Sequence, residues 1–198
     1  MLTQKRFNHV VREDGWLGSR IKEAELRAVR DLVPSGIEVL DYGCGTGLVA
    51  LDLARRGSAV TAYDPMPELV VRARTGAYQA NLQIEFVNAE AELRHRKWPF
   101  ITCLGLLDYY PYPVPLLTKL RNHLNPEGGI VMTCLNALSP LTWSGLLGSH
   151  VAAHTARSLR WAVVRAGLRV WNIDFAFPRV EFLGHTLVVI LTTGLSRV

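Results

Sequence analysis

The sequence predicts an α/β fold in which helices cover both faces of a doubly wound, mostly parallel sheet. Three features carry this prediction. An apolar run at residues 37–40 passes through a glycine-rich loop into a helical pattern at 48–56. Apolar runs and helical patterns then alternate along the chain, as they do where helical crossovers join parallel strands. Residues 100–107 are nearly all apolar, which is typical of a strand buried on both faces of a parallel sheet.

Size and composition fit one globular domain. The chain has 198 residues, of which 49% are hydrophobic and 20% charged, so there is ample material for a core. The net charge of +5 at pH 7 permits a nucleic acid or an anionic surface as a partner without requiring one. No basic-then-apolar leader opens the sequence, so we expect no signal peptide and a cytoplasmic location.

The cysteines argue for the same compartment. Cys44, Cys103 and Cys134 are odd in number, widely spaced, and lie in or beside apolar strands. This pattern indicates buried, reduced thiols rather than a disulfide framework or a metal site, and no metal-ligand spacing is visible in the sequence.

The first helix is predicted at residues 19–33, where apolar residues recur with helical spacing. Ser19 is its candidate N-cap, and Pro34 ends it. Residues 7–18, which precede this helix, show no clear period.

The loop after the first strand has glycine at every second position, at Gly43, Gly45 and Gly47, and follows the acidic Asp41. Glycine is needed where the backbone φ is positive, or where a ligand approaches closer than a Cβ atom allows. Between a strand and a helix, such a loop also points the free N–H groups of the helix start toward a ligand. The spacing differs from the G-x-G-x-x-G of dinucleotide-binding folds, and the preceding acid suits a ligand with a positive charge.

The string D-Y-G-C-G-T-G at residues 41–47 resembles the first motif of the class I S-adenosylmethionine (SAM)-dependent methyltransferases, and the resemblance extends over residues 35–193. It implies a Rossmann-like, seven-stranded, mostly parallel sheet that is closed by a C-terminal antiparallel hairpin. It also implies that residues 1–198 form a single methyltransferase domain with SAM as its cofactor. Residues 1–33 form the N-terminal arm and helix of this domain, and within them residues 7–18 would either fold over the cofactor or dock loosely.

The second strand, residues 59–63, ends at Asp64, and a helix is predicted at 68–74. The acid lies about 20 residues beyond the glycine loop, the interval that places a carboxylate beside a ribose in doubly wound folds. A carboxylate accepts hydrogen bonds from both ribose hydroxyls. The resemblance implies that Asp64 binds the SAM ribose, and the alternative is that it caps the following helix.

The third strand, residues 84–87, precedes a string at 88–92 that is similar to the family's G-D-A-E-type string. The resemblance implies that Glu90 lies near the adenine, with Glu92 as the alternative. The full set of cofactor-binding residues that the resemblance implies is Asp41, Gly43, Cys44, Gly45, Gly47, Asp64, Pro65, Glu90 and Leu106.

The fourth strand, residues 100–107, ends in a polar and aromatic string at 108–113. Ligand sites in open α/β sheets lie beyond the carboxyl ends of the strands, so this string is expected to face the transferred methyl group. It is similar to a string in small-molecule methyltransferases of the ubiquinone-pathway and magnesium-protoporphyrin type, which often have histidine where Tyr109 stands. The candidate catalytic residues are Asp108, Tyr109, His150 and His154.

The remaining elements complete the pattern. A helix is predicted at 114–124 and a fifth strand at 130–135, with a glycine-containing turn between them. A last helix is predicted at 155–166, between Thr155 as its N-cap and Gly167 as its terminator. Two strand-like runs follow, at 169–177 and 186–193, and supply the hairpin that the resemblance implies.

From Gly128 to Ala156 the chain has no Lys, Arg, Asp or Glu. Asn136 and Pro140 interrupt this stretch, so we do not expect a membrane span, which takes about 20 continuous apolar residues. Residues 136–154 are instead predicted to form an apolar lid over the substrate. An ordinary helix on the sheet, a homodimer contact and a peripheral membrane contact are the alternatives.

The resemblance implies direct transfer of a methyl group from SAM to the oxygen or nitrogen of a small, apolar molecule. The protein's part in such a reaction is mainly to align the acceptor and to exclude water. Two alternatives stay open. One is an RNA-modifying methyltransferase, which the basic charge favours but no added RNA-binding module supports, and the other is a SAM-binding protein without transferase activity.

Overall fold

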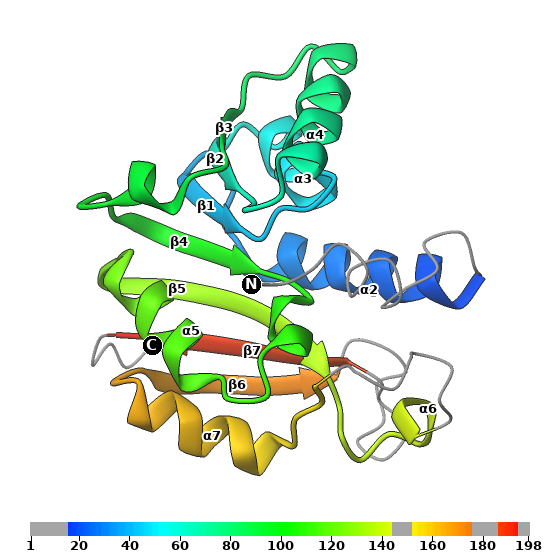
Figure 1. Cartoon of the computed structure of the whole chain (residues 1–198), viewed down its shortest axis with the longest axis vertical. Helices are drawn as coiled ribbons and strands as arrows, with labels where there is room; N and C mark the ends of the chain where they lie inside the picture. Colours follow the sequence, from blue (N-terminus) through cyan, green and yellow to red (C-terminus); the bar gives the residue numbers. More distant parts are fainter. Residues whose placement is uncertain (1–15, 144–151, 176–185, 194–198) are drawn as a thin grey trace.

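The computed structural model describes residues 16–143, 152–175 and 186–193. A seven-stranded sheet with the order β3-β2-β1-β4-β5-β7-β6 forms its centre (Figure 1). The strands are β1 (Glu38–Tyr42), β2 (Ala59–Tyr63), β3 (Glu85–Val87), β4 (Trp98–Cys103), β5 (Leu124–Leu135), β6 (Arg169–Phe175) and β7 (Thr186–Thr192). The first five strands of this order are parallel, whereas β7 pairs antiparallel with β5 and β6. The predicted fold class is confirmed.

Helices cover both faces of this sheet. They are α2 (Trp16–Leu32), α3 (Leu48–Arg55), α4 (Pro67–Gln79), α5 (Val114–Asn122), α6 (Pro140–Trp143) and α7 (Ala156–Arg165), together with the 3₁₀ turns η1 (Glu90–Leu93) and η2 (Leu106–Tyr109). The buried apolar residues form two hydrophobic cores. One contains Val29 of α2 and Leu53 of α3, and the other contains Leu117 of α5 and Leu159 of α7. α4 lies near β3, and α7 runs along β6 at the opposite edge of the sheet (Figure 1).

The central strands supply side chains to both cores. Val39 of β1 belongs to the core under α2 and α3, and its neighbour Leu40 belongs to the core under α5 and α7. In β5, Val131 likewise belongs to the core under α2 and α3, and Met132 belongs to the core under α5 and α7. Successive strand residues point to opposite faces, so a strand with helices on both sides has to be apolar throughout. This explains why these strands stand out in the sequence as continuous apolar runs.

The fourth strand ends earlier than predicted, at Cys103 instead of residue 107. Gly105 has a φ of 66°, a left-handed conformation that does not continue a strand, and η2 begins at the next residue. Leu107 is fully buried within η2. An apolar run therefore cannot distinguish a buried strand from a buried turn that follows it.

Two other boundaries differ from the prediction. The N-cap assigned to Ser19 is wrong, because α2 begins at Trp16 and includes Ser19. α4 continues to Gln79 and does not end at residue 74. Gly76 lies inside α4, and a Cβ atom there would make an ordinary van der Waals contact of 3.4 Å with Leu51 Cδ1 of α3.

The predicted turn before the fifth strand is a bulge at the start of β5. Leu124 pairs with Trp98, and Gly129 pairs with Phe100, so β5 carries extra residues between these two pairs. Glu127 within the bulge has a φ of 65°. The strand thus begins before residue 130. The residues predicted to form a turn instead form the bulge that interrupts the pairing of β5 with β4.

The predicted ends of the last helix are confirmed. Thr155 is the N-cap of α7, and its hydroxyl accepts a hydrogen bond from Ser158 N–H at 3.0 Å. Ser158 Oγ accepts one in return from Thr155 N–H at 3.0 Å, which completes a capping box. Gly167 follows the helix with a φ of 73°.

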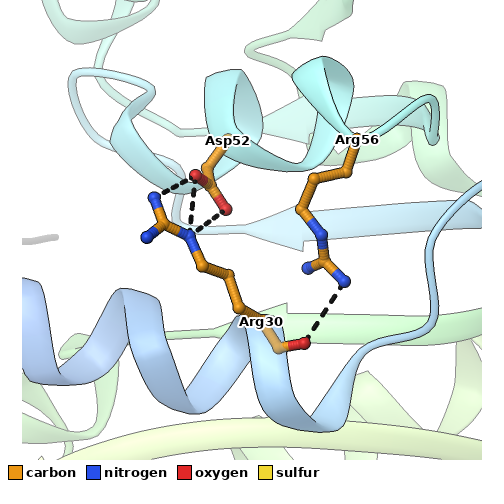
Figure 2. A network of polar contacts seen from close by, with 3 residues as sticks. All are labelled: Arg30, Asp52 and Arg56. Carbon is orange, nitrogen blue, oxygen red and sulfur yellow. Dashed lines mark hydrogen bonds and ion pairs between the residues drawn. The ribbon is translucent and has the colours of Figure 1, made fainter.

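A polar network fastens α2 to α3 (Figure 2). Arg30 Nη2 lies 2.6 Å from Asp52 Oδ1. Arg56 donates hydrogen bonds to the carbonyl oxygens of Arg30, at 3.3 Å, and of Val33, at 2.8 Å. Carbonyls at a helix C-terminus lack partners within the helix, so Arg56 caps α2 from outside. The network fixes α2 relative to the glycine loop that precedes α3.

The described residues test the predictions on the cysteines and the membrane span, and part of the prediction on the lid. Cys44, Cys103 and Cys134 are free and buried, as predicted. In the described ranges, no helix has both the length and the apolar character that a bilayer span requires. Of the predicted lid, residues 144–151 lie outside the described residues, and His150 is among them.

Candidate active site

The site lies at the carboxyl ends of the parallel strands, where the topology changes direction. From β1 the chain builds β2 and β3 on one side and then returns to place β4 on the other side. Loops that leave such a switch point diverge, and the crevice between them is where open α/β sheets bind ligands. The ends of β1, β2 and β4 carry the glycine loop, Asp64 and Leu106.

The glycine loop is tied to the end of β2. The N–H groups of Gly43 and Cys44 donate to Tyr63 O at 2.8 and 2.9 Å, and Gly45 N–H donates to Asp64 Oδ2 at 2.9 Å. Cys44 is buried and contributes its backbone to this arrangement. The loop is therefore fixed by hydrogen bonds from its own backbone, which leaves its remaining surface available to a ligand.

Three glycines of the loop have positive φ but different surroundings. A Cβ atom on Gly45 would meet nothing within 4 Å, so open space lies above this residue. A Cβ atom on Gly47 would lie 2.8 Å from Ala73 Cβ, so Gly47 serves the packing of α3 against α4. A Cβ atom on Gly43 would lie 3.1 Å from Leu106 Cδ2, which places Leu106 against the loop.

Asp64 connects two loops. Its carboxylate accepts hydrogen bonds from Gly45 N–H through Oδ2 and from Met66 N–H through Oδ1, both at 2.9 Å. Asp64 is buried, and burial raises its pKa. The N-cap of α4 is Met66, so Asp64 fixes the start of that helix through the N-cap residue and is not itself the cap. The intervening Pro65 is exposed.

Asp41 is a buried acid below the loop. Oδ1 accepts a hydrogen bond from Thr102 Oγ1 at 2.8 Å, and Oδ2 has no hydrogen-bond partner among the described residues. The pKa of Asp41 is raised to about 7, mainly by burial and to a smaller extent by the charge of Asp64, while hydrogen bonding from the Thr102 hydroxyl and the Ala50 backbone acts against this rise. An unpaired buried carboxylate oxygen is costly, so the site favours a cationic ligand group.

Glu90 lies on η1 after β3, and both of its oxygens have partners. Tyr42 Oη donates to Oε1 at 3.0 Å, and Lys119 Nζ lies 2.8 Å from Oε2. Burial acts to raise the pKa of Glu90, but its bonds to Lys119 and Tyr42 outweigh burial and lower it. Glu92, the alternative for the adenine, is exposed on the same turn.

The predicted catalytic residues lie at the ends of β4 and β5. Asp108 is buried and accepts a hydrogen bond from Leu135 N–H through Oδ1 at 2.8 Å. Burial raises the pKa of Asp108 well above its ordinary value and also raises the pKa of Tyr109. His154 is buried, with Nε2 3.4 Å from Leu107 O, and burial lowers its pKa. At neutral pH Tyr109 and His154 are therefore uncharged, and the Asp108 carboxyl holds a proton more readily than an ordinary carboxyl.

The sequence did not single out Glu25, which α2 brings to the same end of the sheet. Glu25 Oε1 accepts a hydrogen bond from Thr133 Oγ1 at 2.6 Å, and Thr133 Oγ1 accepts one from Gly105 N–H at 2.9 Å. Burial raises the pKa of Glu25, and the charge of Glu25 adds to burial in raising the pKa of Asp108. The sequence did contain a signal for this residue. Glu25 is an acid four residues after the inward-facing Ile21, so helical spacing places it on the side of the helix that faces the sheet.

A cavity of about 1080 Å³ lies elsewhere and contains none of the predicted site residues. Glu38, Ala59 and Trp98, the first residues of β1, β2 and β4, line it, so it opens at the amino ends of the strands. Ligand crevices of open α/β sheets lie at the carboxyl ends, which favours the site described above. Over the described ranges, no three His, Cys, Asp or Glu side chains are grouped as a metal site would need.

Comparison with known proteins gives matches over most of the chain. A family model described as "Methyltransferase domain" matches residues 16–173. The ubiquinone biosynthesis O-methyltransferase of Xanthomonas axonopodis pv. citri (strain 306) is 34% identical over 109 residues, which cover 53% of this chain and 46% of that protein. A ubiquinone biosynthesis O-methyltransferase of Xylella fastidiosa (strain M23) is 35% identical over 106 residues, which cover 52% of this chain and 43% of that protein. The matched region is thus about half the length of these curated relatives.

Solved structures share the fold. The magnesium protoporphyrin IX methyltransferase from Synechocystis PCC 6803 with bound S-adenosylhomocysteine (SAH) is similar with a TM-score of 0.73 and 17% identity, over 95% of this chain and 92% of that one. An S-adenosylmethionine-dependent methyltransferase from Clostridium acetobutylicum ATCC 824 is similar with a TM-score of 0.72 and 14% sequence identity. The match covers 96% of this chain and 97% of that one. At these identities, the likeness establishes the arrangement of the strands and helices.

Proposed function

Because the chain belongs to the family of methyltransferase domains, we propose that it is an enzyme that transfers a methyl group from SAM to a small molecule. The observation that carries this proposal is the unpaired Oδ2 of Asp41, which is buried near the end of β1, two residues before the glycine loop. SAM carries its positive charges at the amino-acid end and at the sulfur. A cation above Asp41 supplies the partner that this oxygen lacks.

The predicted cofactor residues have separate proposed roles. The open space above Gly45 admits the amino-acid end of SAM next to the backbone, and Leu106 lines the site beside the loop. Each oxygen of Asp64 accepts one backbone N–H, so each retains a lone pair for a ribose hydroxyl. Pro65 follows on the open side, and Glu90 lies toward the adenine end because η1 continues from β3.

Bound SAM supplies a methyl group on a positively charged sulfur, which a nucleophile can attack directly. The residues of this chain then have to align the acceptor and keep water out. Burial raises the pKa values of Asp108 and Tyr109, which favours their protonated forms, and the carbonyls of Leu107 and Tyr110 both act on the His154 ring. We propose that Asp108, Tyr109 and His154 orient the acceptor at the ends of β4 and β5, and that none withdraws its proton.

The apolar nature of the acceptor is supported by the segment 136–154. Its two ends are fastened side by side, because Ala137 N–H donates to His154 O and His154 N–H donates to Leu135 O, both at 2.9 Å. Leu138, just beyond β5, is 51% exposed. The two ends of the segment are therefore anchored beside the acceptor end of the site, and its sequence contains no Lys, Arg, Asp or Glu. We propose that it covers an apolar oxygen or nitrogen acceptor.

The test is calorimetric titration of the chain with SAM and with SAH. We expect both to bind in the micromolar range. Asp64→Asn should weaken SAM by about 1.5–3 kcal/mol, because it removes charged hydrogen bonds to the ribose. Asp31→Asn, which changes an exposed acid on α2, is the matched control and should leave binding unchanged. If neither SAM nor SAH binds, the glycine loop is structural and the proposal fails.

A further inference from the structure

The outward face of α7 combines exposed apolar side chains with arginines. Trp161 is 61% exposed and Val164 is 70% exposed. Arg157, Trp161 and Val164 are spaced at i, i+4 and i+7, which puts them in one line along the helix. Arg160 and Arg165 are exposed and flank this line. We refer to these five residues as the α7 face.

The α7 face is not needed to hold the helix on the sheet. The opposite side of α7 buries Leu159, Ala162 and Val163 in the core that it shares with α5. Single exposed apolar residues are normal on proteins. Here Trp161 and Val164 are adjacent on one helix and enclosed by cations, which calls for a partner with both apolar and anionic character.

Positive charge dominates the part of the sequence that carries this face. No Asp or Glu occurs between residues 155 and 173, a stretch that contains Arg157, Arg160, Arg165 and Arg169. The Arg165 guanidinium lies 5.4 Å from the ring centroid of Trp161. Arg121 of α5 adds a further cation at the end of α7, where Nη1 donates to Ala166 O at 3.1 Å. Charge complementarity therefore requires an anionic occupant.

We propose that the α7 face docks on the surface of an anionic lipid bilayer. Arginines pair with lipid phosphates, tryptophan prefers the membrane–water interface, and an aliphatic side chain gains only by leaving water. Val164 has neither a charge nor a ring for a nucleic acid to stack on, which disfavours RNA. A second copy of the chain would bring arginines against arginines. The docking does not depend on the methyl transfer proposed above.

The position of α7 gives such docking a use. α7 starts two residues after His154, whose backbone is bonded to the end of β5. The N-terminal turn of the helix, with Arg157, is therefore close in the chain to the acceptor side of the site. If the acceptor is apolar, as proposed above, a bilayer at this face lies near the site that has to receive it.

The experiment is co-sedimentation of the full chain with vesicles of phosphatidylcholine alone and of phosphatidylcholine mixed with phosphatidylglycerol. We expect binding to the mixed vesicles only, and weaker binding as the salt concentration rises. Arg157→Glu/Arg160→Glu should weaken it by at least about tenfold, because each basic residue near an anionic surface contributes about fivefold. An acid at position 157 lies in the first turn, where it is stabilising, and position 160 is exposed, so this variant should keep α7 folded. Trp161→Ala/Val164→Ala should also weaken binding.

Matched controls exist on the opposite edge of the sheet, around α4 and η1. Arg72→Glu/Arg94→Glu changes the net charge by the same amount at exposed positions, and Tyr78→Ala removes an aromatic residue that is 86% exposed. Both should bind the mixed vesicles like the unchanged protein. Three results would overturn the proposal: no binding to the mixed vesicles, equal loss in the control variants, or binding of RNA through the α7 face without binding of vesicles.

Discussion

At the scale of single residues, the site depends on how two acids are satisfied. Asp64 is buried with both oxygens bonded to backbone N–H groups, whereas Asp41 is buried with only one oxygen bonded. Burial raises the pKa values of both carboxyls, and the charge of Asp64 contributes further to the rise for Asp41. The energy cost of the unpaired oxygen is present in the free protein and would be relieved by a cation.

The first prediction follows from the pKa of Asp41, which is raised to about 7. Below that pH the carboxyl is protonated and cannot pair with a cation. We expect the affinity for SAM to rise with pH up to about 7, by up to about tenfold per unit, and then to level off. Calorimetry at several pH values measures this, and an affinity that does not change between acid and neutral pH would contradict the pairing.

Asp41→Asn is the companion variant. It should remove the pH dependence of SAM binding while weakening SAM at neutral pH. The folded-state pKa of Asp41 lies above its ordinary value of 3.8, so the native state binds more protons than the unfolded chain between about pH 4 and pH 7. Asp41 therefore makes the free protein less stable as the pH rises through that window. Asp41→Asn should remove this loss, which urea titration at both ends of the window can measure.

At the scale of elements, the glycine loop joins three functions in a few residues. It ends β1, it starts α3, and it carries the contact between α3 and α4. Gly45 borders open space, whereas Gly47 is pressed against Ala73 of α4. The same sequence pattern thus contains one glycine suited to a ligand and one that serves packing.

The prediction at this scale separates these two glycines. Gly47→Ala should lower the free energy of unfolding by about 2–4 kcal/mol, because a left-handed φ and an overpacked contact both add cost. Gly45→Ala should lose only about 1–2 kcal/mol of stability, but it should weaken SAM strongly because its Cβ enters the open space. Gly57→Ala, with a φ of 83° and open surroundings, measures the backbone cost alone. Equal effects of Gly45→Ala and Gly57→Ala on SAM binding would refute the assignment.

At the scale of the whole molecule, α2 is linked to both the frame and the site. Arg30 and Arg56 hold it to α3, and Glu25 reaches through Thr133 to the loop after β4. The Thr133 hydroxyl donates to one partner and accepts from the other. A single buried side chain therefore connects the N-terminal helix, the fifth strand and the loop that carries Gly105.

The prediction at this scale concerns Thr133→Val, which keeps the shape but removes the hydroxyl. Glu25 and Gly105 N–H then lose a partner, so the free energy of unfolding should fall by about 1–3 kcal/mol. SAM affinity should fall as well, because Leu106 follows Gly105 directly. The control is Thr75→Val, which removes an exposed hydroxyl on α4. It should change the free energy of unfolding by no more than about 0.5 kcal/mol. Unchanged SAM affinity in Thr133→Val would show that this link does not reach the site.

Features that depend on neighbours in the chain could be predicted from the sequence. The strand at 59–63, the cap at Thr155 and the alternation of strands and helices rest on local sterics, local hydrogen bonds and side-chain periodicity, and the structure confirms them. The family follows from the glycine string because its spacing is a local backbone requirement. The roles of Asp64, Glu90 and Tyr109 toward cofactor and acceptor stay predictions.

Tertiary structure alone decided which groups lack partners and which faces stay exposed. The unpaired oxygen of Asp41, the link from Glu25 to Gly105, and the end of β4 all depend on elements that are distant in sequence. The exposure of Trp161 is of the same kind, because helical spacing marks two apolar sides of α7 without saying which one the sheet covers. Burial and hydrogen bonding are properties of the assembled neighbours, so they are settled only when the sheet brings those neighbours together.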